Sequence, residues 1–269
     1  MAIKLIAIDM DGTLLNQRHE VTPEVIAAIH AAQAKGIAIV LATGRPFVGV
    51  QSYLQVLQLQ RPGQFCITNN GALVQHAENG QCVVEITLSF DDYLYVEKLA
   101  QQLGVSFQAL SHDSLFTPNK DISPYTIHEA SLTGIPLRYR AADEMDTQLT
   151  FPKLMMIDTP EKLDRAIEQL PQEAKARYTM VKSAPFYLEV LNNGVSKGSA
   201  LQQLTERLGL SAQQVMAIGD QENDISMIEF AGTGVAMGNA IDSVKAIAQY
   251  VTGANTENGV AQAIEKLAL

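Results

Sequence analysis

The chain has 269 residues, 47% of them hydrophobic, which is enough apolar material for one large or two modest globular domains. Its formal net charge of −10 argues against nucleic acid or an anionic membrane as partners, because both require concentrated Lys and Arg. The sequence has no apolar run of the ~18 residues that a membrane span needs, no secretory leader and no Cys-x-x-Cys pair, so we expect a soluble cytoplasmic protein without disulfides or zinc.

The first apolar run begins at Ile3 and ends in two carboxylates, Asp9 and Asp11, followed by Gly12. Side chains i and i+2 of a strand point to the same side, so we expect the two carboxylates to converge while Gly12 turns the chain away. At ~4 Å their repulsion is about 4 kcal/mol at an effective dielectric of about 20, and a bound cation, first of all Mg²⁺, would turn it into attraction. A plain turn explains Asp-x-Asp-Gly equally well, whereas a calcium loop fails on ligand spacing.

The next elements form a strand, helix, strand unit. Residues 22–24 supply an N-cap, a first-turn proline and a first-turn acid, and a helical apolar stripe follows as far as Gly36. The continuous apolar run 37–41 is typical of a strand buried on both faces of a parallel sheet. Similar strands are predicted at 65–68, 215–218, 234–237 and 250–251, with helices at 223–230, 241–248 and 258–267. The two ends of the chain therefore predict an α/β fold with a Rossmann-like parallel-sheet core.

The middle of the chain has a different pattern. A hairpin-turn signal at 69–71 precedes alternating residues at 81–86, and later strands are predicted around 154–157 and 187–191. Helices are predicted at 90–103 and from 159 to near 171. We therefore expect a discontinuous catalytic core of residues 1–83 and 190–269, and a large inserted α/β cap domain of residues 84–189.

Polar residues follow four of the predicted strands. Ligands of open parallel sheets bind beyond the carboxyl ends of the strands, so residues 9–11, 43–46, 69–71 and 219–224 should face one cleft. The second segment has groups that suit an anion. Thr43 offers a hydroxyl, Gly44 offers an unobstructed backbone N–H, and a helix is expected to start at Pro46 with its positive end facing the site. An ordinary strand-to-helix turn explains that segment as well.

The last segment contains Asp220 and Asp224, which could serve a metal, and Asn223, whose amide could donate to a phosphate oxygen. Helix capping is the alternative for these three residues. Lys197 stands at the start of a predicted helix, where a cation is electrostatically misplaced, so an anionic partner would explain it. A solvated surface lysine is the alternative.

Four ordered motifs carry a family resemblance: Asp-Met-Asp-Gly-Thr at 9–13, Thr-Gly-Arg at 43–45, Lys197 with Gly198, and Gly-Asp-x-x-Asn-Asp at 219–224. They resemble the motifs of the haloacid dehalogenase superfamily of phosphatases, and the long insertion resembles the cap of its Cof-type branch. The whole chain is similar to a bacterial sugar phosphatase of that branch. The resemblance implies Mg²⁺-dependent hydrolysis of small phosphate monoesters, with sugar phosphates as the expected substrates, through an aspartyl-phosphate intermediate.

The resemblance also implies a role for each site residue. Asp9 would attack phosphorus, while Asp11 would protonate the leaving alcohol and then deprotonate the hydrolytic water. Mg²⁺ would bind Asp9, the backbone carbonyl of Asp11 and Asp220, with Asp224 in support. Five residues would hold the phosphate oxygens. Met10 would do so through its backbone N–H, and the others are Thr43, Gly44, Lys197 and Asn223. The cap would close over the cleft and set specificity.

Three other functions stay open at this point. A phosphoacceptor signalling domain also combines acids, a Thr and a Lys around a parallel sheet, but an acid two residues beyond the nucleophile favours turnover. A non-catalytic phosphate-ligand sensor would bind without releasing phosphate, and a phosphomutase would use similar chemistry. The sequence predicts neither the physiological substrate nor the oligomeric state.

Overall fold

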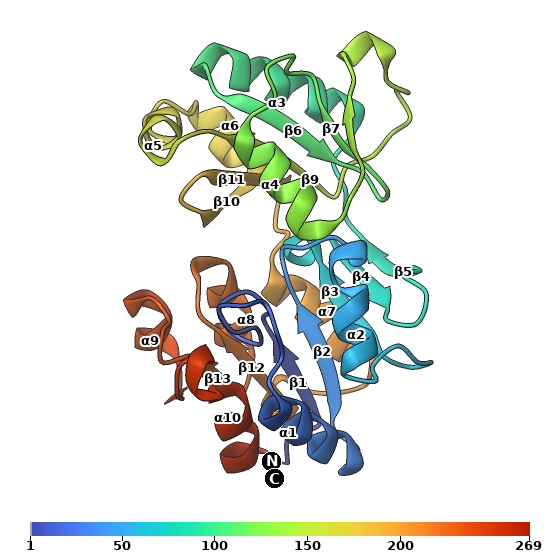
Figure 1. Cartoon of the computed structure of the whole chain (residues 1–269), viewed down its shortest axis with the longest axis vertical. Helices are drawn as coiled ribbons and strands as arrows, with labels where there is room; N and C mark the ends of the chain where they lie inside the picture. The colour runs from blue at the N-terminus through green and yellow to red at the C-terminus, as the bar shows by residue number, and fades with distance from the viewer. Residues whose placement is uncertain (1) are drawn as a thin grey trace. The chain divides into compact units, whose positions relative to one another are not determined.

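The computed structural model describes residues 2–269, and the chain divides into two compact units (Figure 1). The first unit comprises the residues up to Val84 together with Ser196–Leu269, and the second comprises Glu85–Val195. The sequence placed the second boundary at 189/190, six residues earlier. Strand β11 (Tyr187–Asn192) explains the difference, because it pairs with two strands of the second unit and continues past that point.

The first unit is built on an eight-stranded sheet in the order β14-β13-β12-β1-β2-β3-β4-β5. The strands are β1 (Leu5–Ile8), β2 (Ala38–Ala42), β3 (Phe65–Thr68), β4 (Leu73–His76), β5 (Cys82–Glu85), β12 (Val215–Gly219), β13 (Thr233–Ala236) and β14 (Tyr250–Val251). Strands β14 through β3 run parallel, and β4 returns antiparallel to β3. Every residue of the central strand β1 is buried, as expected for an apolar strand covered on both faces. The predicted parallel α/β core is confirmed.

Helices cover this sheet. They are α1 (Pro23–Ala34), α2 (Gln51–Val56), α7 (Lys197–Arg207), α8 (Ile225–Phe230), α9 (Asp242–Ile247) and α10 (Gly259–Leu267). Helix α1 begins as the sequence predicts, since the Thr22 hydroxyl accepts a hydrogen bond from the backbone N–H of Val25. In Figure 1, α1 lies beside α10, and these two helices are in contact.

Two predicted helix starts are wrong. The helix expected from Pro46 is a single 3-10 turn, Phe47–Gly49, and α2 begins only at Gln51. The interruption contains Gly49, a residue with poor helix propensity. The helix expected from residue 223 likewise opens with a 3-10 turn, Glu222–Asp224, before α8. The two 3-10 turns follow β2 and β12, so the backbone just beyond these strands, where predicted site residues lie, is not α-helical.

The second unit is also an α/β structure, with a six-stranded sheet in the order β10-β11-β9-β6-β7-β8. The remaining strands are β6 (Ser106–Leu110), β7 (Leu115–Thr117), β8 (Leu137–Tyr139), β9 (Lys153–Ile157) and β10 (Tyr178–Ala184). Its helices are α3 (Phe90–Leu103), α4 (Pro124–Thr133), α5 (Pro160–Glu168) and α6 (Gln172–Arg177). The predicted helix 90–103 is confirmed, and it begins at a Ser89–Asp92 capping box and ends at the left-handed Gly104.

The second unit contains a buried ion cluster between α4 and the sheet. The ammonium of Lys153 lies 3.1 Å from a carboxylate oxygen of Glu189 on β11 and 3.4 Å from one of Glu129 on α4. All three side chains are buried, so charge pairing contributes to the docking of α4.

Among residues 2–269, no helix has the length and hydropathy needed to cross a membrane.

Candidate functional site

The candidate site lies in the first unit, at the carboxyl ends of four neighbouring parallel strands. Strand β12 leads into Asp220, β1 into Asp9, β2 into Thr43 and β3 into Asn69. Because these strands run in the same direction, their ends meet at one edge of the sheet. The four segments singled out in the sequence are therefore neighbours in space, although Asp9 and Asp220 are 211 positions apart along the chain.

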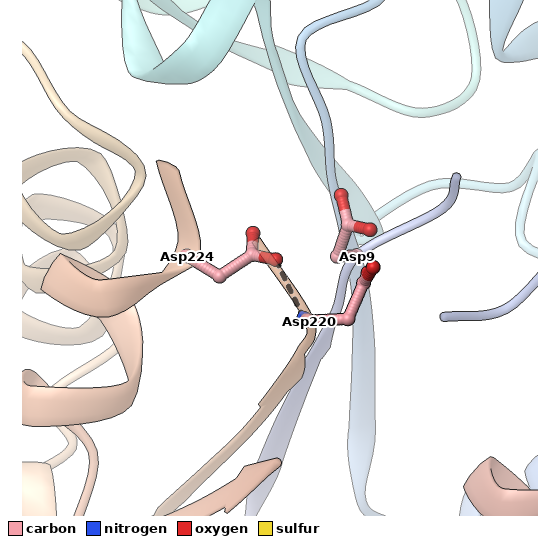
Figure 2. A group of neighbouring side chains, drawn as sticks. All are labelled: Asp9, Asp220 and Asp224. Carbon is pink, nitrogen blue, oxygen red and sulfur yellow. Dashed lines mark hydrogen bonds between the residues drawn. The ribbon is translucent and has the colours of Figure 1, made fainter. Parts of the chain in front are cut away.

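Three carboxylates from this edge form a cluster, shown in Figure 2. One oxygen from each of Asp9, Asp220 and Asp224 lies within 4.8 Å of the others. The three residues are buried, with relative exposures of 5%, 3% and 0%. Three acids this close together repel one another strongly unless positive charge compensates them.

Lys197 supplies part of that charge. Its ammonium donates to an oxygen of Asp9 and to an oxygen of Asp224, both at 2.6 Å, and the side chain is completely buried. Burial alone would lower the pKa of this ammonium, but the charges of Asp224 and Asp9 outweigh burial and raise the pKa above its usual value. The alternative of a solvated surface lysine is therefore wrong.

Asp224 is occupied by the protein itself. While one oxygen accepts from Lys197, the other accepts from the backbone N–H groups of Asp220 and Gln221 at 2.8 and 3.0 Å. A Cβ added at Gly219 would lie 2.5 Å from the Asp224 side chain, so only glycine allows this approach. Asp224 thus holds the lysine and the loop in place, which suits a supporting role.

Asp9 and Asp220 carry the surplus negative charge. Burial, followed by the charge of Asp224, raises the pKa of Asp9 well above its usual value, and Lys197 opposes this shift. Burial and Asp224 also raise the pKa of Asp220 to about 6, while a hydrogen bond of 2.7 Å from the Thr13 hydroxyl opposes the rise. With all three acids ionised and one lysine charged, the cluster has a net charge of −3 + 1 = −2. Such a set of oxygen ligands suits a hard divalent cation.

Asp11 lies apart from this cluster. Its carboxylate receives two hydrogen bonds from the guanidinium of Arg45, Nε to Oδ2 at 2.8 Å and Nη2 to Oδ1 at 2.5 Å. Of the two acids expected to converge, only Asp9 belongs to the acid cluster, while Asp11 pairs with Arg45. Strand β1 ends at Ile8, so the alternation of side chains along a strand does not extend to Asp11. Arg45 is buried, whereas the Asp11 side chain is 44% exposed.

The segment after β2 lies beside the end of β1, the strand that leads into Asp9. The Thr43 side chain is buried, and its hydroxyl accepts from the backbone N–H of Arg45 at 3.1 Å. Gly44 lies against the amide of Asn70, because a Cβ at position 44 would come within 3.2 Å of that group. Met10 buries its side chain in the core, so any contribution to a ligand comes from its backbone.

Two residues of the site have roles that the sequence does not predict. Arg45 stands out only as part of a motif, although it holds Asp11. Asn70 was noted only within a turn signal, although its side-chain oxygen accepts from the amide of Asn223 at 3.0 Å. The pair Asn-Asn before Gly71 was an available signal, because asparagine tolerates the left-handed backbone found there.

Comparison with known proteins identifies the family. The model of the haloacid dehalogenase-like hydrolases matches residues 6–264, nearly the whole chain. The chain belongs to this family. The family resemblance of the four motifs is therefore confirmed. In this haloacid dehalogenase-like hydrolase, the acid cluster with Lys197 joins three of them, the motifs at 9–13, 197–198 and 219–224.

Several relatives match this family member over almost its whole length. It is 48% identical to YxeH of Bacillus subtilis (strain 168), covering 99% of this chain and 98% of that protein. It is 34% identical to YcsE of the same organism, named as a 5-amino-6-(5-phospho-D-ribitylamino)uracil phosphatase, covering 97% and 94%. A solved haloacid dehalogenase-like hydrolase from Bacteroides thetaiotaomicron matches with a TM-score of 0.87 and 33% identity, covering 98% and 99%.

Proposed function

We propose that this protein is a Mg²⁺-dependent phosphatase that hydrolyses small phosphate monoesters, with sugar phosphates as the expected substrates. The observation that carries the proposal is the buried Asp9 carboxylate, held by Lys197 beside a second acid, Asp220. This arrangement brings together a carboxylate that could attack phosphorus, a fixed positive charge and oxygen atoms that could bind a cation. Relatives named as phosphatases support the same reaction.

Asp9 would be the nucleophile. Lys197 binds its Oδ1, which leaves Oδ2 to form the bond to phosphorus while the bond from phosphorus to the ester oxygen breaks. Bound Mg²⁺, held by Asp9, Asp220 and the backbone carbonyl of Asp11, would neutralise surplus charge and lower the pKa of Asp9. The product of the first step is an aspartyl phosphate and an alkoxide that needs a proton.

Asp11 would supply that proton and later remove one from the hydrolytic water. Because Arg45 binds both of its oxygens in this structure, the Asp11 side chain must leave the guanidinium before it can serve the substrate. Its partial exposure leaves room for such a rotation. Arg45 thus defines a resting position for the acid.

The phosphate would be held by groups that surround Asp9. They are the backbone N–H groups of Met10 and Gly44, the Thr43 hydroxyl, the Lys197 ammonium and the Asn223 amide. Charge spreads over the phosphoryl oxygens in the transition state, so donors aimed at them lower the barrier. The second unit, Glu85–Val195, would act as the cap that selects the leaving group.

Sugar phosphates remain the proposed substrate class. YcsE is named for an ester of phosphate with a ribityl chain, a polyol that is chemically close to a sugar. A screen should therefore include sugar phosphates, polyol phosphates, nucleotides and phosphorylated cofactors.

The proposal is tested by phosphate release in that screen, with Mg²⁺ and with a chelator, for the wild type and Asp9→Asn. We expect turnover that is abolished by chelation and by the substitution, because an amide cannot replace the attacking carboxylate. Asp242→Asn, an exposed acid at the start of α9, is the matched control and should keep full activity. Equal activity in Asp9→Asn would remove that residue from the mechanism.

The same experiment separates the other functions. A phosphate-ligand sensor would capture phosphate esters stoichiometrically without releasing phosphate. A signalling domain would accumulate a long-lived phosphoprotein, and a phosphomutase would yield an isomeric ester. Any of these outcomes in place of steady phosphate release would overturn the phosphatase proposal.

A further inference from the structure

The turn after β3 has an unusual backbone. Three consecutive residues, Asn69, Asn70 and Gly71, have φ values of +49°, +55° and +98°. Left-handed conformations are unfavourable for residues other than glycine and concentrate at functional sites. The turn also buries the side-chain oxygen of Asn69, which has no hydrogen-bond partner among the described residues. The fold therefore maintains this turn at an energetic cost.

Packing holds the turn in place. A Cβ added at Gly71 would lie 2.1 Å from the backbone oxygen of Ser196, the residue before Lys197. The backbone N–H of Asn69 donates to the carbonyl of Arg45 at 3.1 Å. The turn is thus tied on one side to the start of α7 and on the other to the segment after β2.

Asn70 contacts three of the residues proposed to hold phosphate, Thr43, Gly44 and Asn223. Its backbone N–H donates to the carbonyl of Thr43 at 3.0 Å. Its side-chain oxygen accepts from the amide of Asn223 at 3.0 Å. Its amide atoms lie 3.2 and 3.3 Å from the position of a Cβ at Gly44. Asn70 is only 1% exposed, so this arrangement is built into the interior of the site.

From this geometry we propose that Asn70 is a positioning residue of the phosphate site and acts through Asn223; this inference rests on the proposed function. A primary amide carries two N–H donors in one plane. When Asn70 accepts one of them, the plane of the Asn223 amide is set and its second N–H has a defined direction. Donors that are oriented in advance bind a phosphate without reorganisation.

The test uses Asn70→Gly, because glycine keeps the left-handed backbone and removes only the side-chain amide. We expect a roughly tenfold rise in the inhibition constant of inorganic phosphate and in KM, the effect of losing one well-aligned hydrogen bond to a charged ligand. The matched control is Asn258→Gly, since Asn258 has φ +60° but its side chain accepts from the Thr22 hydroxyl instead. The control should change both constants less than twofold.

A double-mutant cycle separates positioning from general stability. If Asn70 acts through Asn223, Asn70→Gly should change the phosphate inhibition constant less than twofold in an Asn223→Ala background. Equal effects of Asn70→Gly in both backgrounds would overturn the inference, and so would equal effects of Asn70→Gly and Asn258→Gly. Should the glycine variant not fold, Asn70→Ser removes the amide oxygen that accepts from Asn223 without adding a charge. It should raise the inhibition constant roughly tenfold, and an unchanged constant would contradict the inference.

Failure of this inference is distinguishable from failure of the proposed function. A wild type that hydrolyses phosphate esters, with Asp9→Asn inactive and Asn70→Gly unchanged, would uphold the function and reject the role of Asn70. If the wild type hydrolyses no ester, calorimetric binding of inorganic phosphate to the wild type and Asn70→Gly still tests the positioning role. A roughly tenfold weaker affinity in the variant supports it, and equal affinity or no detectable binding rejects it.

Discussion

Asp9 and Asp220 are buried acids in one cluster with Asp224, and the buried ammonium of Lys197 pairs with Asp9 and Asp224 but not with Asp220. Their raised pKa values show that, without a cation, the folded protein binds protons there more tightly than an unfolded chain does. This part of the site therefore opposes folding at neutral pH. If these acids serve the proposed reaction, they do so at the expense of stability.

The free energy of unfolding in the absence of divalent cations should depend on pH accordingly. An unfolded Asp has a pKa of about 3.9, and Asp220 has one of about 6 in the folded protein. Between these values the folded state holds the extra proton, so stability falls as pH rises from ~4 to ~6. Asp220→Asn removes this contribution. It should stabilise the metal-free protein at pH 7 by about 1–3 kcal/mol while abolishing activity.

Urea unfolding in chelator from pH 4.5 to 7.5 measures this effect. The wild type should show a steeper loss of stability with pH than Asp220→Asn. The exposed-site variant Asp242→Asn should follow the wild type. If Asp220→Asn and the wild type have the same pH dependence, the charge at residue 220 does not oppose folding.

At the scale of elements, helix α4 is joined to the sheet of the second unit by the ion cluster of Lys153, Glu129 and Glu189. Replacing one member of a buried ion pair leaves an uncompensated charge. Lys153→Met should therefore lower the free energy of unfolding of this unit by about 3–5 kcal/mol, although methionine fills a similar volume.

The matched control is Lys182→Met on β10. Lys182 pairs with Asp164, but both side chains are partly exposed, so its loss should cost less than about 1 kcal/mol. Denaturant unfolding and hydrogen exchange of α4 measure the two effects. Equal stability of the two variants would show that the buried cluster contributes no more than a surface pair.

The sequence predicted most elements because their signals are local. The helix 90–103 was predicted with a glycine at its end, and both the helix and its Gly104 cap are found in the structure. The helix expected from Pro46 was wrong, because a proline marks a permissible start but does not show that i→i+4 hydrogen bonds follow. The second domain boundary was placed early because strand pairing, which keeps β11 with its neighbours, is not a local property.

For the whole molecule, a bound divalent cation should stabilise the folded chain. A cation that binds only the assembled cluster would add RT ln(1 + [Mg²⁺]/Kd), about 2.7 kcal/mol at a concentration of 100 Kd. We expect Mg²⁺ to raise the melting temperature of the wild type and chelator to reverse the rise. Asp220→Asn should show little shift, whereas Asp242→Asn should behave as the wild type.

Thermal unfolding monitored by circular dichroism, with and without Mg²⁺, measures this stabilisation. Sodium chloride of equal ionic strength controls for screening of the overall negative charge. An equal rise in Asp220→Asn would place the cation elsewhere on this acidic protein.

The sequence alone determined the parallel α/β core, the family and the residues that follow the strands, because apolar periodicity and motif order are written along the chain. Only the tertiary structure showed that Lys197 bridges Asp9 and Asp224, that Arg45 holds Asp11 away from the cluster, and that Asn70 reaches Asn223. These contacts join residues 27 to 188 positions apart. Such distances are bridged by strand order and register, which depend on the packing of the whole sheet and not on any local pattern.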